Sequence, residues 1–526
     1  MRKALLLLLL VTVPVAEAAR DPRKNIIFIM ADDLGYGDIG PFGQKLIRTP
    51  NLDRLAAEGT TFTHYYAGAS VCSPTRSVLM TGQHTGHTRV RGNHGRAGVE
   101  RVPLRAQDVT VAEHLKYFGY ATGIVGKWGL GEPGNEGIPN RQGFDHWFGY
   151  LNNNLAEFYY PEKIWRNQEE ILLPGNAGGQ RGQYSHDLMT DEALAFIDAR
   201  HKRPFFLYVA YTIPHSRLEV PEDSLAEYRG KFPEPPSAET GGKNDVPYPR
   251  ATVAAMITRL DRDVGRILDR IKQLQIEKHT VVFFCSDNGA PARPGVSDFF
   301  GSTAGFRGHK GSLYEGGIRA PMIVRWPGEI AAGRRSSYPW GGWDFLPTAL
   351  ALAGISRPMP GVDGINVLPA LRGKETPRSD YFYWEHHQKT FSQAVREGHL
   401  KAIRENEPRA VSLGYRADHY KLIAFVLSAG ISGLAGAMKA LMFQLASLTD
   451  VHWSMSGEAV LMTLVGGLGT IFGPMFGAFI IVAMQNYLAQ LGAWVTVVQG
   501  VIFVVCVMAF RRGIVGEIAR RLRRPL

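Results

Sequence analysis

The residues best suited to chemistry include one unusual cysteine. The chain has three cysteines, Cys72, Cys285 and Cys506, too few for a disulfide framework. Cys285 and Cys506 lie in apolar runs, which is typical of small buried residues. Cys72 lies in S-V-C-S-P-T-R, among polar residues and a proline that are typical of a loop. Cys72 is therefore the candidate nucleophile, and a buried structural thiol is the alternative.

Two apolar runs are each followed by side chains with oxygen ligands. Taken alone, such residues after a strand are also typical of a turn or a helix cap. Together they offer three carboxylates and an amide, with no His or Cys to favour zinc. This ligand set suits a hard cation, Ca²⁺ better than Mg²⁺. The four candidate metal ligands are Asp32, Asp33, Asp287 and Asn288.

Short apolar runs that end in polar residues recur along the chain and predict buried parallel strands. The predicted strands are Lys24–Met30, Tyr120–Val125, Pro204–Tyr211 and Thr280–Cys285. Helical patterns lie between them, at Asn51–Glu58, Thr110–Tyr117 and Ala251–Leu274. This alternation predicts an α/β fold with a largely parallel sheet. Ligands of such sheets bind at the carboxyl ends of the strands, where distant residues are expected to meet.

Three segments resemble the sulfatase family over about residues 24–398. Ser70–Gly82 contains the signature C-x-P-x-R, Gly126–Gly131 reads G-K-W-G-L-G, and Lys310–Arg319 reads K-x-x-x-x-E-G-G-x-R. The resemblance implies an alkaline-phosphatase-like α/β fold with a mostly parallel central sheet. It also implies arylsulfatase-type hydrolysis of sulfate esters.

The resemblance further implies how the site works. In the family, a formylglycine-generating enzyme oxidises the signature cysteine to formylglycine, whose hydrate attacks sulfur and later expels sulfate. It implies calcium at the four oxygen ligands named above. Positive groups hold the diol and the sulfate oxygens, and a histidine with a pKa near working pH is the candidate donor to the leaving alkoxide. These residues are Cys72, Arg76, Lys127, His215 (the proton donor) and Lys310.

One position departs from the family pattern. The second block usually reads G-K-W-H-L-G, but Gly129 stands at the histidine position. That histidine commonly assists elimination from the sulfated intermediate. His84 and His87, in G-Q-H-T-G-H, are the candidate replacements.

The two ends of the chain carry signals of their own. Residues 1–19 resemble a signal peptide, with Arg2 and Lys3, an apolar stretch and an A-x-A cleavage site. Export to the periplasm or the extracellular space is therefore expected. The net charge of +11 lies largely in the tail and gives no argument for nucleic acid.

The last part of the chain resembles something else. Residues 20–375 are expected to form the sulfatase catalytic domain, and 376–399 a remnant of its C-terminal subdomain. Residues 400–526 resemble a fragment of a branched-chain amino-acid ABC transporter permease, beginning with E-P-R-A-V-S-L-G at Glu407. Three stretches approach or exceed the length of a membrane span, and an arginine-rich tail is typical of a cytoplasmic end. The predicted spans are Leu422–Met438, Ala459–Met484 and Trp494–Phe510.

These observations leave several functions open. The principal interpretation is a sulfatase tethered to a membrane by an all-α segment from a gene fusion. The alternatives are a component of an amino-acid transporter, a phosphatase or phosphodiesterase of the same superfold, and an inactive sulfate-binding relative. A phosphatase would be expected to have a Ser or Thr nucleophile and His/Asp zinc ligands. The substrate remains open among aryl, carbohydrate and glycosaminoglycan sulfates.

Overall fold

The computed structural model describes most of the first 404 residues and parts of the remainder. The described ranges are 23–93, 102–236, 246–355, 359–374, 381–387, 391–398, 400–404 and, beyond these, chiefly 433–438, 453–466 and 473–488. The expected signal peptide lies outside them. The chain divides into two compact units, Met1–Asn406 and Glu407–Leu526, and each is described by itself.

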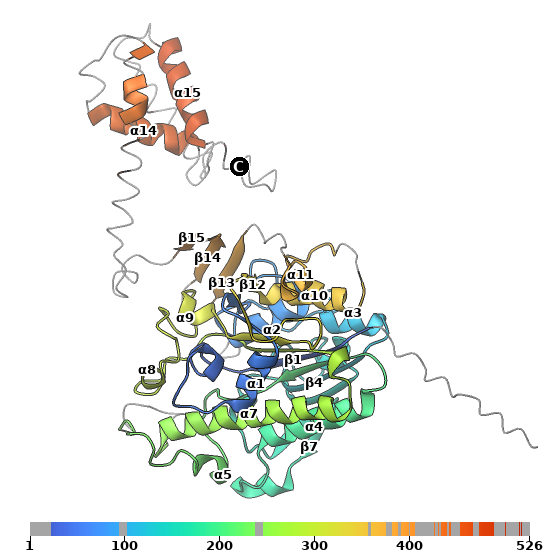
Figure 1. Cartoon of the computed structure of the whole chain (residues 1–526). Helices are drawn as coiled ribbons and strands as arrows, with labels where there is room; N and C mark the ends of the chain where they lie inside the picture. Colours follow the sequence, from blue (N-terminus) through green and yellow to red (C-terminus); the bar gives the residue numbers. More distant parts are fainter. Residues whose placement is uncertain are drawn as a thin grey trace, which may run out of the picture. The chain divides into compact units, whose positions relative to one another are not determined.

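A ten-stranded sheet runs through the first unit (Figure 1). Five neighbouring strands at its centre are parallel, and antiparallel pairings lie toward both edges. This confirms the predicted α/β fold with a largely parallel sheet. In spatial order the strands are β11 (Arg334–Ser336), β2 (Thr60–Phe62), β10 (Met322–Arg325), β9 (Thr280–Ser286), β1 (Asn25–Ala31), β8 (Phe205–Ala210), β4 (Ala121–Lys127), β5 (His146–Tyr150), β6 (Lys163–Arg166) and β7 (Glu169–Leu172).

Helices cover both faces of the sheet because alternate residues of each strand point to opposite sides. In β1, Ile27 and Ile29 belong to the core shared with α1, α4 and α7, whereas Ile26 and Phe28 belong to the core shared with α2, α3 and α10. Figure 1 shows these helices on the two sides. Their bounds are α1 (Pro50–Glu58), α2 (Cys72–Thr81), α3 (Val111–Tyr117), α4 (Ser185–Arg200), α7 (Pro249–Gln273) and α10 (Phe345–Leu352), with short helices α5 (Glu222–Leu225), α8 (Ser297–Phe300), α9 (Glu315–Ile318) and α11 (Leu368–Leu371).

The segment around Cys72 differs from the prediction. Its residue types indicated a loop, but Cys72 is the first residue of α2. Pro74 is tolerated there because the first-turn amides of a helix need no partner within the helix. Gly82, at φ 67°, ends the helix in the left-handed conformation.

A small antiparallel sheet closes the first unit. Its strands are β13 (Phe382–His387), β14 (Phe391–Glu397) and β15 (Leu400–Arg404), and β14 pairs with both of the others. The ammonium of Lys401 lies 3.0 Å from Glu315. Residues 400–404, which the sequence places at the start of the permease-like part, therefore belong to this sheet. A separate two-stranded parallel sheet pairs β3 (Tyr65–Tyr66) with β12 (Trp340–Gly341).

The described part of the second unit contains helices α14 (Trp453–Gly466) and α15 (Gly473–Leu488), which pack together. They divide the predicted span Ala459–Met484 between them. A β-carbon on Gly466 would lie 1.7 Å from the carbonyl oxygen of Gly473, so glycine permits this close approach. Among the described residues, no helix combines the length and apolar character needed to cross a bilayer. The other two predicted spans lie largely outside the described residues.

Trp384 packs the small sheet against the rest of the first unit. A substitution of Trp384 tests this packing. The indole is fully buried, packs against Tyr66 and Trp343, and donates to the carbonyl of Ala67 at 3.1 Å. We expect Trp384→Ala to lower the free energy of unfolding by about 3–5 kcal/mol, measured as a lower melting temperature. The control Phe391→Ala, whose ring is 53% exposed, should change it little. Equal effects of the two substitutions would contradict this role.

Candidate active site

Four neighbouring parallel strands deliver the polar residues of the site at their carboxyl ends. Asp32 and Asp33 follow β1, and Asp287 follows β9, which pairs with β1. Lys127 ends β4, and His215 lies five residues beyond β8. Because β9, β1, β8 and β4 are adjacent, these side chains converge, as the sequence predicted.

Helix α2 places the nucleophile candidate against this edge. The sulfur of Cys72 lies 3.5 Å from Oδ1 of Asp32. Arg76 lies one turn further along the same face of the helix and is completely buried. One of its terminal nitrogens lies 3.1 Å from Asp287 and 3.4 Å from Asp32, and the other donates to the carbonyl of Lys127 at 2.7 Å. Arg76 therefore joins α2 to three strands.

Two lysines complete the charge balance of the cluster. The ammonium of Lys127 lies 2.5 Å from Asp32, and that of Lys310 lies 2.7 Å from Asp33. With Arg76, three cations face the three buried carboxylates. Removal of one partner from such a buried pair leaves an uncompensated charge, so each side stabilises the other.

Burial raises the pKa of all three carboxyl groups, and their neighbours decide the outcome. For Asp32, Lys127 and the other nearby cations outweigh burial and hold its pKa well below the usual range. Lys310 and His215 likewise lower the pKa of Asp33. For Asp287, burial and then the neighbouring Asp32 raise the pKa to about 6. Asp287 is therefore the least compensated carboxyl of the three.

Hydrogen bonds to the backbone around His215 hold this residue in place. The ring nitrogen that faces away from the carboxylate cluster makes a further contact. Its Nδ1 lies 2.6 Å from the carbonyl of Ser216, and its Nε2 lies 3.4 Å from Asp33. The hydroxyl of Tyr159 donates to the carbonyl of His215 at 2.8 Å, and Arg293 donates to that of Pro214. Burial and then Lys310 lower the pKa of His215 to about 4. The sequence predicted a pKa of His215 near working pH, because local sequence shows neither its burial nor the nearby charge of Lys310.

The residues that support His215 could not be identified from local sequence patterns. Tyr159 lies in the aromatic stretch E-F-Y-Y-P, which by itself does not indicate a contact with the backbone at His215. No sequence pattern indicated Arg293, because its partner, the carbonyl of Pro214, lies 79 residues away in the chain.

The oxygen ligands predicted from the sequence are brought together. Asn288 donates to Asp33 at 2.7 Å, and the backbone amide of Asp33 donates to Asp287 at 3.1 Å. Oδ1 of Asn288 is buried and has no hydrogen-bond partner among the described residues. Such an orphaned acceptor costs free energy unless something binds it. Ligand atoms of Asp32 and Asp33 lie within 4.8 Å of each other and of ligand atoms of Cys72 and His215. The oxygen atoms of Asp32, Asp33, Asp287 and Asn288 are the donors in this cluster that fit a hard cation.

The two candidate replacements for the missing histidine lie elsewhere. His84 and His87 follow the far end of α2, whose nine steps from Cys72 to Thr81 rise about 14 Å. Their rings stack at 4.4 Å, and Nδ1 of His87 lies 2.8 Å from Asp363. Their described contacts do not include the cluster around Cys72. The structure therefore places both histidines away from Cys72, and it does not bring either of them to the position of the family histidine.

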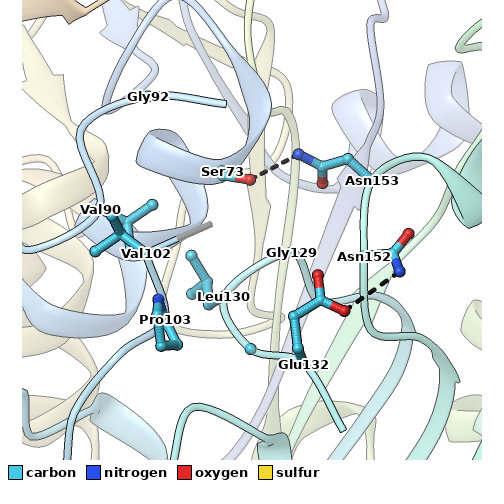
Figure 2. A pocket seen from close by; sticks show the side chains of 11 residues that line it. Ser73, Val90, Gly92, Val102, Pro103, Gly129, Leu130, Glu132, Asn152 and Asn153 are labelled. Carbon is cyan, nitrogen blue, oxygen red and sulfur yellow. Dashed lines mark hydrogen bonds between the residues drawn. The ribbon is translucent and has the colours of Figure 1, made fainter. Parts of the chain in front are cut away.

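Gly129 stands at the position of the family histidine, and the side chain of Asn153 lies beside it. Gly129 has φ 77°, and a β-carbon there would lie 2.7 Å from Oδ1 of Asn153. Asn153 donates to the hydroxyl of Ser73 at 2.7 Å. Both border a small pocket beside Cys72 (Figure 2). No feature of the sequence indicated Asn153, because its contact with Ser73 spans eighty residues.

Three sequence profiles match the chain. The family described as Sulfatase matches residues 24–355. The family described as N-sulphoglucosamine sulphohydrolase, C-terminal, matches residues 307–434. The family described as Branched-chain amino acid transport system / permease component matches residues 398–507. The last two matches overlap over residues 398–434.

Known proteins agree with the first of these matches. N-acetylgalactosamine-6-sulfatase of Mus musculus is 34% identical over 400 residues, covering 72% of each chain. Arylsulfatase A of Homo sapiens is 35% identical over 432 residues, covering 75% of this chain and 77% of its own. A solved structure of Ps i-CgsB in complex with k-i-k-neocarrahexaose has a TM-score of 0.62 and 31% identity, covering 73% of this chain and 84% of its own.

These matches confirm the predicted sulfatase fold and its mostly parallel sheet, and they support the class of sulfuric ester hydrolases. Members of this family generally use a metal ion, and the acidic cluster described above provides a site for one. The chain belongs to the sulfatase family.

Proposed function

We propose that this sulfatase hydrolyses its ester through formylglycine made from Cys72, with calcium at the adjacent carboxylates. The observation that carries the proposal is the environment of the thiol. Cys72 is buried 3.5 Å from Asp32. Burial and then the charge of Asp32 raise its pKa to about 12. An unmodified thiol is therefore protonated at neutral pH and is a poor nucleophile, so residue 72 is better suited as the precursor of another group.

The modified residue would supply an aldehyde whose hydrate is the nucleophile, and the surrounding residues do the remaining work. Arg76 and Lys127 supply fixed positive charge from α2 and β4, and Lys310 supplies it from the loop before α9. These groups stabilise the negative charge that increases on the sulfate oxygens during transfer. Arg76 and Lys127 are fully buried, Lys310 is partly buried, and all three are paired with carboxylates before substrate arrives, so little reorganisation is needed.

His215 is the group that we assign to the leaving oxygen. In this structure its low pKa keeps the imidazole neutral at pH 7. Its Nδ1 lies beside the carbonyl of Ser216, so Nε2 is the nitrogen that faces the cluster. An arriving anionic ester adds negative charge near the ring and raises its pKa. His215 can then hold a proton at Nε2 and pass it to the departing alkoxide.

Calcium fits the oxygen ligands for reasons of charge as well as chemistry. Asp32, Asp33 and Asp287 are balanced by three cations, so the described cluster is close to neutral. Bound calcium would make it positive, which favours an anionic ester. We propose that these three carboxylates and the orphaned Oδ1 of Asn288 hold the ion.

We further propose that the protein is exported by residues 1–19 and attached to a membrane by its second unit. The permease match supports the second point. Helix α15 supports it as well. Its buried residues are Gly473, Gly477 and Ile481. Phe476 and Phe479 of the same helix are 59% and 74% exposed. An apolar helix face of this kind is suited to lipid. Attachment is favoured over amino-acid transport because the matched residues are only a fragment of a permease.

Removal of the Cys72 side chain tests the catalytic proposal. Protein made with a formylglycine-generating enzyme should release p-nitrophenol from p-nitrophenyl sulfate, and Cys72→Ala should reduce this turnover by about a thousandfold or more because covalent catalysis is lost. The control Cys285→Ala, in β9, should retain it. Equal turnover by wild type and Cys72→Ala would contradict the proposal.

Calcium should stabilise the protein in a pH-dependent way. Asp287 has a raised pKa of about 6, so without metal its contribution to stability is lost as pH rises from about 4 through 6. Calcium needs the ionised form. After treatment with a chelator, added CaCl₂ should therefore raise the melting temperature more at pH 7.5 than at pH 5. Asp287→Asn should weaken this response, and Asp191→Asn, at a side chain that is 60% exposed, should not. The same shift at both pH values would contradict the assignment.

Membrane attachment predicts co-flotation with lipid vesicles. The full chain should float with phosphatidylglycerol-phosphatidylcholine vesicles, because the apolar face of α15 enters the lipid. The double substitution Phe476→Glu and Phe479→Glu should reduce flotation by about tenfold or more. The control Asn486→Glu adds a charge at an exposed polar position of the same helix and should have less effect. Full flotation of the double variant would exclude this face as the anchor.

A further inference from the structure

Strand β13 turns one face toward the rest of the first unit. Alternate residues of a strand share a face, and Phe382, Trp384 and His386 are all buried on the same one. The first two belong to an apolar cluster that includes Val78 of α2. His386 is 8% exposed and is the polar member of this set. A buried polar side chain on an otherwise apolar face costs free energy unless it has a partner, so packing alone favours an apolar residue at this position.

A partner of His386 lies two residues before Cys72. Nδ1 of His386 lies 3.0 Å from the hydroxyl oxygen of Ser70, and Ser70 is completely buried. This hydrogen bond joins residues that are 316 positions apart in the chain. It links the small antiparallel sheet directly to the segment that enters α2.

Further contacts hold the backbone of the same segment. The carbonyl of Ser70 accepts from the amide of Gly311 at 2.8 Å, and Gly311 directly follows Lys310. The hydroxyl of Thr75, in α2, bonds the amide and the carbonyl of Ala69 at 3.0 and 3.1 Å. The start of α2, the loop that carries Lys310 and strand β13 therefore meet at two adjacent residues. Of these contacts, the one from β13 is made by a side chain that can be replaced without altering the charged cluster.

We propose that His386 is a positioning residue for this enzyme, and that it acts through Ser70 to fix residue 72 against the charged cluster. Cys72 lies 3.5 Å from Asp32, and a displacement of reacting groups by about 1 Å can lower a rate about a hundredfold. Loss of the hydrogen bond leaves the buried hydroxyl of Ser70 without this partner, which favours a shift of the segment. The inference rests on the proposed function, since it concerns the placement of the same nucleophile.

Substitutions of His386 test this role on the full-length, formylglycine-containing protein with p-nitrophenyl sulfate. His386→Phe keeps a ring but removes the hydrogen bond. It should lower kcat about tenfold or more and change KM less than about twofold, because the nucleophile is misaligned while the sulfate-binding groups remain. His386→Asn places a carboxamide near the position of Nδ1, so it should retain most of the wild-type kcat. Each kcat is divided by the fraction of residue 72 that mass spectrometry identifies as formylglycine.

Ser70→Ala removes the other side of the same contact. It should lower kcat by a factor similar to that of His386→Phe. The double variant should lose no more than either single variant, because both substitutions remove one interaction. Losses that multiply would show that His386 does not act through Ser70 and would overturn the inference. If His386→Phe fails to fold, Ser70→Ala decides the outcome, and an unchanged kcat in that variant would overturn the inference.

His387 provides the matched control. It is the next residue of β13 and points to the opposite face, where its Nε2 lies 2.7 Å from Glu385 and its side chain is 33% exposed. His387→Phe should leave kcat and KM unchanged. Equal kcat for His386→Phe and His386→Asn would overturn this inference while leaving the proposed chemistry intact. A formylglycine-containing wild type that does not cleave p-nitrophenyl sulfate would overturn the proposed function and this inference together.

Discussion

The catalytic unit depends on the balance of buried charge at one edge of its sheet. Asp32, Asp33 and Asp287 leave water together, which would be prohibitive without the opposite charges that contact them. Arg76 is central to this balance, because it reaches two of the carboxylates from α2 and also bonds the end of β4. The same contacts place Cys72 beside Asp32. The position of Cys72 and the stability of the cluster are therefore consequences of one set of interactions.

The parts of this arrangement that follow a regular physical rule could be predicted from the sequence. Apolar runs that end in Asp32–Asp33 and Asp287–Asn288 indicated strands, and the geometry of parallel sheets then required their ends to meet. The helical start at Cys72 was missed because Ser73 and Pro74 are equally typical of loops and of first helical turns. Asn153 could not be found, because its contact with Ser73 joins a loop to helix α2 across eighty residues and no local pattern records it.

The junction between the two parts of the chain is structurally continuous with the sulfatase unit. Residues 398–434 match two family profiles, yet β15 pairs with β14 and its Lys401 contacts Glu315. Lys401 also lies 5.3 Å from the ring of Trp384. The first strands of the subdomain thus retain packing partners in the catalytic unit even though the sequence changes character soon afterwards. The family assignment and the active-site geometry do not depend on the second unit.

The central claim is that residue 72 acts as formylglycine and not as a thiol, and mass spectrometry tests it most directly. Protein from a cell that contains a formylglycine-generating enzyme is digested, and the peptide carrying residue 72 is weighed alongside an assay of p-nitrophenyl sulfate turnover. We expect a peptide about 18 Da lighter than the cysteine peptide. The fraction of this lighter peptide should rise in proportion to turnover. Full turnover by protein whose residue 72 is entirely unmodified cysteine would contradict it.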